Sequence, residues 1–206
     1  MINILYKDKY IAVCVKPSGM LSEGGKDSLP AALSEELSSG GAPATLFPVH
    51  RLDRDTEGIM VYARTEKAAA LLSEAIAAHR FEKEYIARVC GVPQPPRGIM
   101  EDLLFYDRQR GKSFVVQRER KGVKKAALTY ELISYDKDSN TSLVKILLGT
   151  GRTHQIRVQF ASRGMPLVGD RRYGAPAADV ATPSLIAHRL AFDHPKTGER
   201  MEFKIN

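Results

Sequence analysis

The sequence has few of the residues that disulfides and metal sites require. Its 206 residues include only two cysteines, Cys14 and Cys90, and both lie inside apolar runs. This placement favours buried, reduced thiols over a disulfide framework or a zinc site. The five histidines are widely spaced, and none forms a short metal-ligand pattern such as HExxH. We therefore expect neither a structural disulfide nor a bound metal.

Long hydrophobic runs are also missing. No segment approaches the roughly 18 consecutive apolar residues of a membrane-spanning helix. The first residues show no basic stretch followed by an apolar run and a cleavage site, so no secretory signal is expected. Low-complexity tracts are absent, and 43% hydrophobic with 27% charged residues is ordinary for a globular protein. The sequence predicts a folded, cytoplasmic protein without a membrane segment.

Positive charge is in excess. Lys and Arg number 31 against 24 Asp and Glu, which gives a formal charge of +7. Such a balance favours polyanionic partners, above all nucleic acid, because each cation placed on a phosphate releases counterions. Residues 107–125 (DRQRGKSFVVQRERKGVKK) concentrate the charge. This segment fits two interpretations equally well. It can form a hairpin that reaches across phosphates, or a hairpin that is only a solvated part of the surface.

Hydrophobic periodicity predicts more strands than helices. Strands are expected at 4–6, 10–15, 59–63, 84–92, 127–135 and 141–148, and a strand–turn–strand at 185–205. Amphipathic helices are expected at 28–37 and 66–79. The stretch 38–44 (SSGGAPA) is flexible in composition, and prolines interrupt the chain at 93–96. We predict one α+β domain over residues 1–206, with a mainly antiparallel mixed sheet.

Two segments concentrate chemically active side chains. In HRLDRDTEG (50–58), Asp53 lies between Arg51 and Arg54, whose charges favour an ionised carboxylate that can act as nucleophile or base. Asp55 is a competing carboxylate, and the whole cluster could equally be a surface ion network. The second segment, TGRTHQIRVQFASRG (150–164), combines Thr, Arg, His and Gln side chains before an apolar face.

The first segment resembles the HRLD-x-x-TSG motif of the RluA-type RNA pseudouridine synthases. Further segments resemble that family in its order, namely KPSGMLS (16–22), KEYIARVCG (83–91), GTGRTHQIRVQFASRGMPLVGDRRYG (149–174) and LIAHRLAFDHPKTGE (185–199). Together they cover most of residues 4–205. The chain starts directly with this region, so we expect no preceding S4-like RNA-binding module.

The resemblance implies a role for each matching residue. Asp53 is the catalytic aspartate, and Arg157 pairs with it through a guanidinium suited to orient a carboxylate. Tyr85 stacks on the flipped uracil and assists proton transfer. Arg51 enters the RNA where the target base leaves the stack. The remaining residues implied in RNA binding or base flipping are Arg54, Arg152 and His154.

Other roles, outside those that the resemblance implies, remain open for three of these side chains. Arg157 could contact a phosphate, Tyr85 could be a core tyrosine, and Arg51 could form a structural salt bridge with Asp55. The sequence also departs from the family at three positions, where it has Glu57 for serine, Cys90 for a frequent aromatic and Gln159 for histidine. None of these departures removes a proposed catalytic group.

The implied activity is isomerisation of a specific uridine in ribosomal or transfer RNA to pseudouridine. The resemblance implies no cofactor and no metal, since positioning and electrostatics can suffice. No protein partner is expected, and the absence of heptads favours a monomer. Two alternatives remain, a non-catalytic RNA-binding or RNA-folding module and a hydrolase that uses Asp53 with Asp55.

Overall fold

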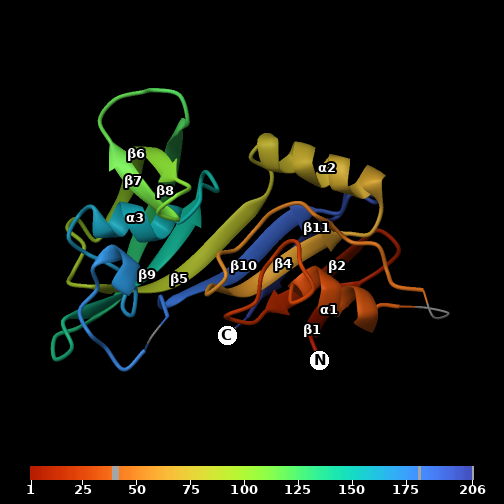
Figure 1. The fold of residues 1–206 in the computed structure, drawn as a ribbon, viewed down its shortest axis with the longest axis horizontal. Coiled ribbons are helices and arrows are strands. Elements are labelled where there is room, and N and C mark those ends of the chain that lie inside the picture. Colours follow the sequence, from red (N-terminus) through yellow and green to blue (C-terminus); the bar gives the residue numbers. More distant parts are fainter. Residues whose placement is uncertain (39–41, 181, 206) are drawn as a thin grey trace. The chain divides into compact units, whose positions relative to one another are not determined.

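The chain divides into two compact units. The computed structural model describes residues 1–38, 42–180 and 182–205 (Figure 1). The first unit comprises Met1–Lys83 and Ala187–Asn206, and the second comprises Glu84–Ile186. The expected single domain over residues 1–206 stays a prediction. Of the stretch expected to be flexible, residues 39–41 lie outside the described residues.

The first unit contains a mainly antiparallel part of a larger sheet. Its strands are β1 (Asn3–Lys7), β2 (Ile11–Lys16), β4 (Glu57–Ala63) and β10 (Leu185–Asp193), in this order. Two further strands join it, because β3 (Phe47–Pro48) pairs with β4 and β11 (Arg200–Lys204) pairs with β10. The turn between β1 and β2 is held by the Asp8 carboxylate, which accepts from the backbone N–H groups of Tyr10 and Ile11.

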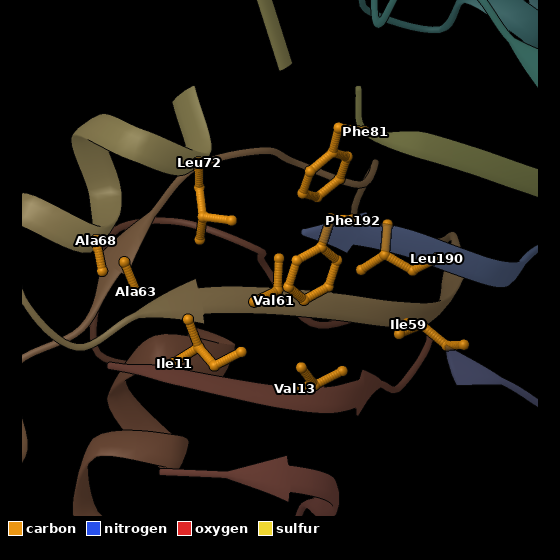
Figure 2. Close-up of a cluster of buried hydrophobic side chains, with 10 residues drawn as sticks. All are labelled: Ile11, Val13, Ile59, Val61, Ala63, Ala68, Leu72, Phe81, Leu190 and Phe192. Atoms are coloured by element: carbon orange, nitrogen blue, oxygen red, sulfur yellow. The ribbon is translucent and has the colours of Figure 1, made fainter. Parts of the chain in front are cut away.

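Helix α2 (Glu66–Ala77) covers one face of this sheet. The helix begins where the predicted one does, since the Thr65 hydroxyl accepts from Ala68 N at 3.1 Å and caps the first turn. Alternate residues of the strands point to the side of the sheet on which the helix lies, and the Phe81 and Phe192 rings stack there with their centroids 5.3 Å apart (Figure 2). The cluster consists of Ile11, Val13, Ile59, Val61, Ala63, Ala68, Leu72, Phe81, Leu190 and Phe192.

The side chains of β2 and β4 that point to the other face of the sheet are buried as well. Tyr62 is fully buried, and its hydroxyl donates to Ser22 O at 2.7 Å, which fixes the loop before α1 (Leu29–Glu36) on that face. Cys14 is buried here as expected, and burial raises the pKa of its thiol to about 12. Cys90 is only half-buried. Both faces of the central strands therefore carry a core.

The strands of the second unit belong to the same 11-stranded sheet and pair antiparallel with one another. The strand order is β5 (Glu82–Cys90), β9 (Thr141–Leu148), β8 (Val123–Asp136), β6 (Arg97–Asp107) and β7 (Lys112–Val116). The short helix α3 (Gln155–Ala161) packs on β6 and β7, and a single 3-10 turn, η1, spans Arg171–Tyr173. A small core forms between them from Leu104, Ala126, Val158 and Tyr173.

The predicted α+β class with a mainly antiparallel sheet is confirmed. The helices expected at 28–37 and 66–79 are α1 and α2, and the proline-rich loop at 93–96 separates β5 from β6. Strand β6 and helix α3 were not among the predicted elements, because charged or polar residues interrupt the apolar pattern of both segments. Within the described residues, no helix is long and apolar enough to cross a membrane.

The close approach of β4 and β10 generates a stability prediction. Gly58 has φ +134°, and an added Cβ would lie 2.3 Å from Ala187 O. Because backbone must move to accept it, Gly58→Ala should lower the free energy of unfolding by about 3 kcal/mol or more, as measured by urea denaturation. Gly198→Ala is the control, since Gly198 has φ +74° but no atom within 4 Å, and should cost about 1 kcal/mol. Equal losses in both variants would contradict the steric explanation.

Candidate active site

The loop between β3 and β4 carries Arg51, Asp53 and Arg54. It is held by its backbone, because all four carbonyls from residue 52 to residue 55 accept hydrogen bonds. Leu52 O accepts from the Ser22 hydroxyl at 2.9 Å, and Asp53 O accepts from Thr56 N at 3.1 Å. The carbonyls of residues 54 and 55 are bound by the segment 16–19. The Asp53 side chain, which is half-buried, therefore projects from a firmly anchored turn.

Lys16 is the main anchor of this loop. Its side chain is fully buried, and Nζ donates to the carbonyls of Pro17 and Met20 at 2.8 Å and of Arg54 at 2.7 Å. Burial lowers the pKa of the ammonium group to about 8, against the attraction of nearby carboxylates that include Asp53. The group therefore still carries its proton at neutral pH.

The segment after Lys16 completes the attachment. The Ser18 hydroxyl donates to Asp55 O at 2.9 Å. Gly19 and Arg54 bind each other reciprocally, since Gly19 N donates to Arg54 O and Arg54 Nε donates to Gly19 O, both at 2.9 Å. The KPSG segment, which the sequence singled out only by resemblance, thus acts as a clamp on the loop that carries Asp53.

Arg51 lies on the surface of the loop. Its guanidinium contacts the Glu23 carboxylate at 2.7 Å, and both side chains are about half exposed. The alternative salt bridge with Asp55 is therefore not the one that forms. An exposed pair of this kind is weak, so Arg51 can exchange Glu23 for another anion at little cost.

His50, which precedes this arginine, is a structural residue. Its Nε2 accepts from Val61 N at 3.1 Å, and its Nδ1 is buried without a hydrogen-bond partner in the described part of the chain. Burial, helped by the charge of Lys83, lowers the pKa of the imidazole to about 3. The ring is neutral, and it packs against Phe81 at 5.4 Å between ring centroids.

The other predicted site residues belong to the second unit. Tyr85 is buried in β5, opposite Ile146 of β9. Arg152 lies on the exposed loop before α3, and its Nε donates to Lys125 O at 2.9 Å. His154 and Arg157 stand at the start of α3. The structure thus gathers Arg51, Asp53 and Arg54 in one loop of the first unit and Arg152, His154 and Arg157 in one segment of the second.

Arg157 is buried and has a carboxylate partner that the sequence did not predict. Its Nε and Nη2 donate to the two oxygens of Asp170 at 2.7 and 2.9 Å, and neither side chain is more than 6% exposed. The guanidinium also lies over the Tyr173 ring at 5.2 Å. A bidentate pair stacked on an aromatic ring fixes the plane of the guanidinium. The predicted pairing of Arg157 with Asp53 stays a prediction.

Tyr173 connects this pair to His154. The buried tyrosine hydroxyl accepts from Ser113 N at 2.8 Å and lies 3.0 Å from His154 Nδ1. His154 has φ +53°, a conformation that is rare for a residue with a side chain. Because the hydroxyl has accepted from Ser113, its hydrogen can point to Nδ1 and hold the strained histidine in place.

The departures from the family pattern are accommodated locally. Glu57 is exposed at the first position of β4. Gln159 is buried in α3, where Nε2 donates to Met100 O at 3.2 Å and to the Asp102 carboxylate at 2.7 Å. Its Oε1 has no hydrogen-bond partner among the described residues. In the same part of the chain, no group of three or more His, Cys, Asp or Glu side chains is arranged to hold a metal ion.

Comparisons with known proteins show which family the chain resembles. The family profile described as RNA pseudouridylate synthase matches residues 10–162. The chain is 36% identical over 209 residues to the dual-specificity RNA pseudouridine synthase RluA of Escherichia coli K12, covering 98% of this chain and 91% of that protein. It is 34% identical over 220 residues to an uncharacterized RNA pseudouridine synthase of Aquifex aeolicus, covering 99% of this chain and 69% of the relative.

Solved structures support the fold. Human RNA pseudouridylate synthase domain containing 4 superposes with a TM-score of 0.78 at 24% identity, covering 99% of this chain and 88% of the other. Human RNA pseudouridylate synthase domain containing 1 gives a TM-score of 0.80 at 22% identity, covering 100% and 83%.

The buried ion pair of the second unit should be strongly coupled. Removing either partner breaks the buried bidentate pair, so Arg157→Met and Asp170→Leu should each lower the free energy of unfolding by about 3 kcal/mol. The double variant removes both charges of this pair, and the pairwise interaction can be lost only once, so its cost should fall short of the sum by about 2 kcal/mol in urea denaturation. The exposed pair Arg97 and Glu131 is the control and should couple by under about 1 kcal/mol. Additive costs for Arg157 and Asp170 would refute the coupling.

The buried imidazole of the first unit predicts an acid-sensitive stability. The folded-state pKa of His50 is about 3, below the ordinary value of about 6.5, so the unfolded chain takes up the proton first as pH falls. The free energy of unfolding should therefore fall as the pH drops below about 6.5, by up to about 2 kcal/mol at pH 5. His50→Gln keeps an acceptor but cannot titrate, and unfolding at pH 7.5 and pH 5 should show a smaller difference than in wild type. His79→Gln, at an exposed position, should leave the difference unchanged. An unaltered pH dependence in His50→Gln would rule out this source.

Proposed function

The chain belongs to the RNA pseudouridylate synthase family, and we propose that it isomerises a specific uridine of ribosomal or transfer RNA with Asp53 as the catalytic aspartate. The enzyme is an RluA-type RNA pseudouridine synthase, an isomerase. In the reaction the bond between N1 of uracil and C1′ of ribose breaks, the base turns, and C5 bonds to C1′. The proton leaves C5, and N1 ends protonated. No electrons are gained or lost.

The observation that carries the proposal is the anchoring of the Asp53 loop. Four consecutive backbone carbonyls, of residues 52 to 55, are bound, so the backbone that carries Asp53 is held in place before any RNA arrives. Preorganisation of this kind is what a reaction without cofactor chemistry requires, because positioning and electrostatics supply the rate. Asp55 lies on the same loop and is the internal competitor for the role.

Tyr85 and Arg157 complete the proposed catalytic set. Tyr85 contributes a ring for stacking on the extruded uracil and a hydroxyl for proton transfer at C5. Arg157 orients the Asp53 carboxylate, a role that the Asp170 and Tyr173 contacts support by fixing its guanidinium plane. Arg51, Arg54, Arg152 and His154 hold the RNA with the target base flipped.

The substrate proposal rests on relatives and on charge. The Escherichia coli relative is named a dual-specificity RNA pseudouridine synthase, which supports an RNA substrate, and the +7 charge supports phosphate binding. We place the enzyme in the cytoplasm and propose that it acts as a monomer, without a cofactor.

The proposal is tested by product formation. RNA transcripts of both classes are labelled with tritium at uracil C5, so that each turnover releases the label. Wild type should release tritium, and Asp53→Asn should reduce the rate by at least about 10³-fold, since the amide is neither nucleophile nor base. Asp55→Asn is the matched control on the same loop and should retain most of the activity.

The outcomes separate the alternatives. Loss with Asp55→Asn but not Asp53→Asn would reassign the catalytic carboxylate. Release of free uracil in place of pseudouridine would support a hydrolase. Tight RNA binding without tritium release from either RNA class would favour the non-catalytic RNA-binding or RNA-folding module.

A further inference from the structure

Two basic segments far apart in the sequence meet in the second unit. The turn between β6 and β7 is joined to η1 by a reciprocal pair of hydrogen bonds. Lys112 Nζ donates to Arg172 O at 2.7 Å, and Arg172 Nη1 donates to Gly111 O at 2.7 Å. Ser113 and Tyr173 extend the attachment beneath the surface, through the bond from Ser113 N to the tyrosine hydroxyl. The turn belongs to the basic segment 107–125, whereas residues 171 and 172 lie outside that segment.

The positive charge of this region is not neutralised by carboxylates. Lys112 and Arg172 are oriented by backbone carbonyls, which fix a cation without cancelling its charge. Arg108 and Arg171 are exposed, and neither side chain contacts a carboxylate in the described part of the chain. Among these residues the nearby acid is Asp107, which caps the turn and lies 3.6 Å from Arg110. Of the five cations in the two segments, Arg110 alone pairs with a carboxylate in the described part of the chain.

Elsewhere in the chain many arginines are paired with acids. Arg163 binds Asp102, and Arg189 and Arg200 both bind Glu82. Such pairs carry little net charge and stabilise the chain locally. The contrast indicates that the cations at the β6–β7 turn are arranged for an anion that comes from outside the chain.

Aromatic rings hold two of the cations in position. Arg110 and Lys112 lie over the Phe114 ring at 6.0 and 5.7 Å, and Lys112 also lies 4.8 Å from the centre of the Tyr173 ring. Contacts of this kind are worth about 0.5–1 kcal/mol at exposed sites and leave the charge available. A cation that is already ordered loses less side-chain entropy on binding. The arrangement therefore suits repeated phosphates of a polyanion.

We propose that Arg108, Arg110, Lys112, Arg171 and Arg172 form one RNA phosphate-binding surface, called here the two-segment basic surface. The proposal rests on the proposed function for the identity of the polyanion as substrate RNA. Gly111 leaves room for the Arg172 guanidinium, because an added Cβ would lie 3.1 Å from Arg172 Nη1. The surface reads no sequence, since phosphate contacts set position and affinity and not base identity.

The test measures the salt dependence of RNA binding. The double variant Arg108→Ala/Arg171→Ala removes two cations whose side chains make no hydrogen bond in the described residues, so folding should be unaffected and the melting temperature unchanged. The probe is a fluorescein-labelled, unmodified transfer RNA transcript, followed by anisotropy in potassium chloride. The slope of log K against log salt should fall in magnitude by about 1.4, and binding at about 0.1 M salt should weaken about 25-fold.

A control variant has the same net charge as Arg108→Ala/Arg171→Ala. Lys67→Ala/Lys137→Ala removes two exposed cations, one on α2 and one on the β8–β9 turn beside Asp136 and Asp138, and should change the slope by less than about 0.5. An unchanged slope in Arg108→Ala/Arg171→Ala, or an equal fall in the control, would overturn the proposal.

The test is independent of catalysis. Asp53→Asn should bind the same RNA with the wild-type slope although it makes no product. If wild type released no tritium, the proposed function would fail, yet the difference in slope between the two double variants would still decide whether the two-segment basic surface binds phosphates.

Discussion

A buried ammonium group organises the loop that carries Asp53. Lys16 sits at the end of a strand that is buried on both faces, where an unsolvated charge is costly unless its hydrogens are satisfied. Three carbonyls satisfy them, one of which belongs to Arg54 in the neighbouring loop. A hydrogen bond to a charged group contributes about 1.5–3 kcal/mol, so no neutral side chain of similar size could replace it. The path of the chain from 16 to 20 and the position of the loop follow from this requirement.

Much of the first unit could be predicted from its sequence because its strands and helices are locally consistent. Residues 10–15 and 59–63 are apolar and rich in β-formers, and Thr65 stands directly before a helix-forming run. The anchoring role of Lys16 could not be predicted in the same way. A lysine after an apolar strand reads as a solvated strand end, and only the tertiary structure shows that its carbonyl partners surround it. His50 is similar, since its neutral, buried state depends on Val61 and Phe81.

The second unit shows why the partners of a predicted site residue could not be predicted from the sequence. Arg157 stood out within a dense polar motif, whereas Asp170 lies 13 positions later in a segment without secondary-structure signal. Tyr173 could have been suspected only as a core aromatic, and its contacts with Arg157, His154 and Ser113 are non-local. Strand β6 and helix α3 escaped prediction for a related reason: Asp102 and Gln159 interrupt their apolar patterns, and the two side chains bind each other. In the folded protein the two polar side chains of such a pair hydrogen-bond to each other. In the sequence they only interrupt the hydrophobic periodicity.

Cations in this protein are held in two physically different ways, and the difference bears on function. A carboxylate partner, as Asp170 is for Arg157, fixes the cation and cancels its charge, which suits a buried position. A backbone carbonyl fixes the cation and leaves its charge nearly whole. Arg54, Arg152, Lys112 and Arg172 are all oriented in this second way, by the carbonyls of Gly19, Lys125, Arg172 and Gly111. An enzyme that binds a polyanion needs side chains that are both ordered and charged. A cationic side chain that donates to a backbone carbonyl has both properties.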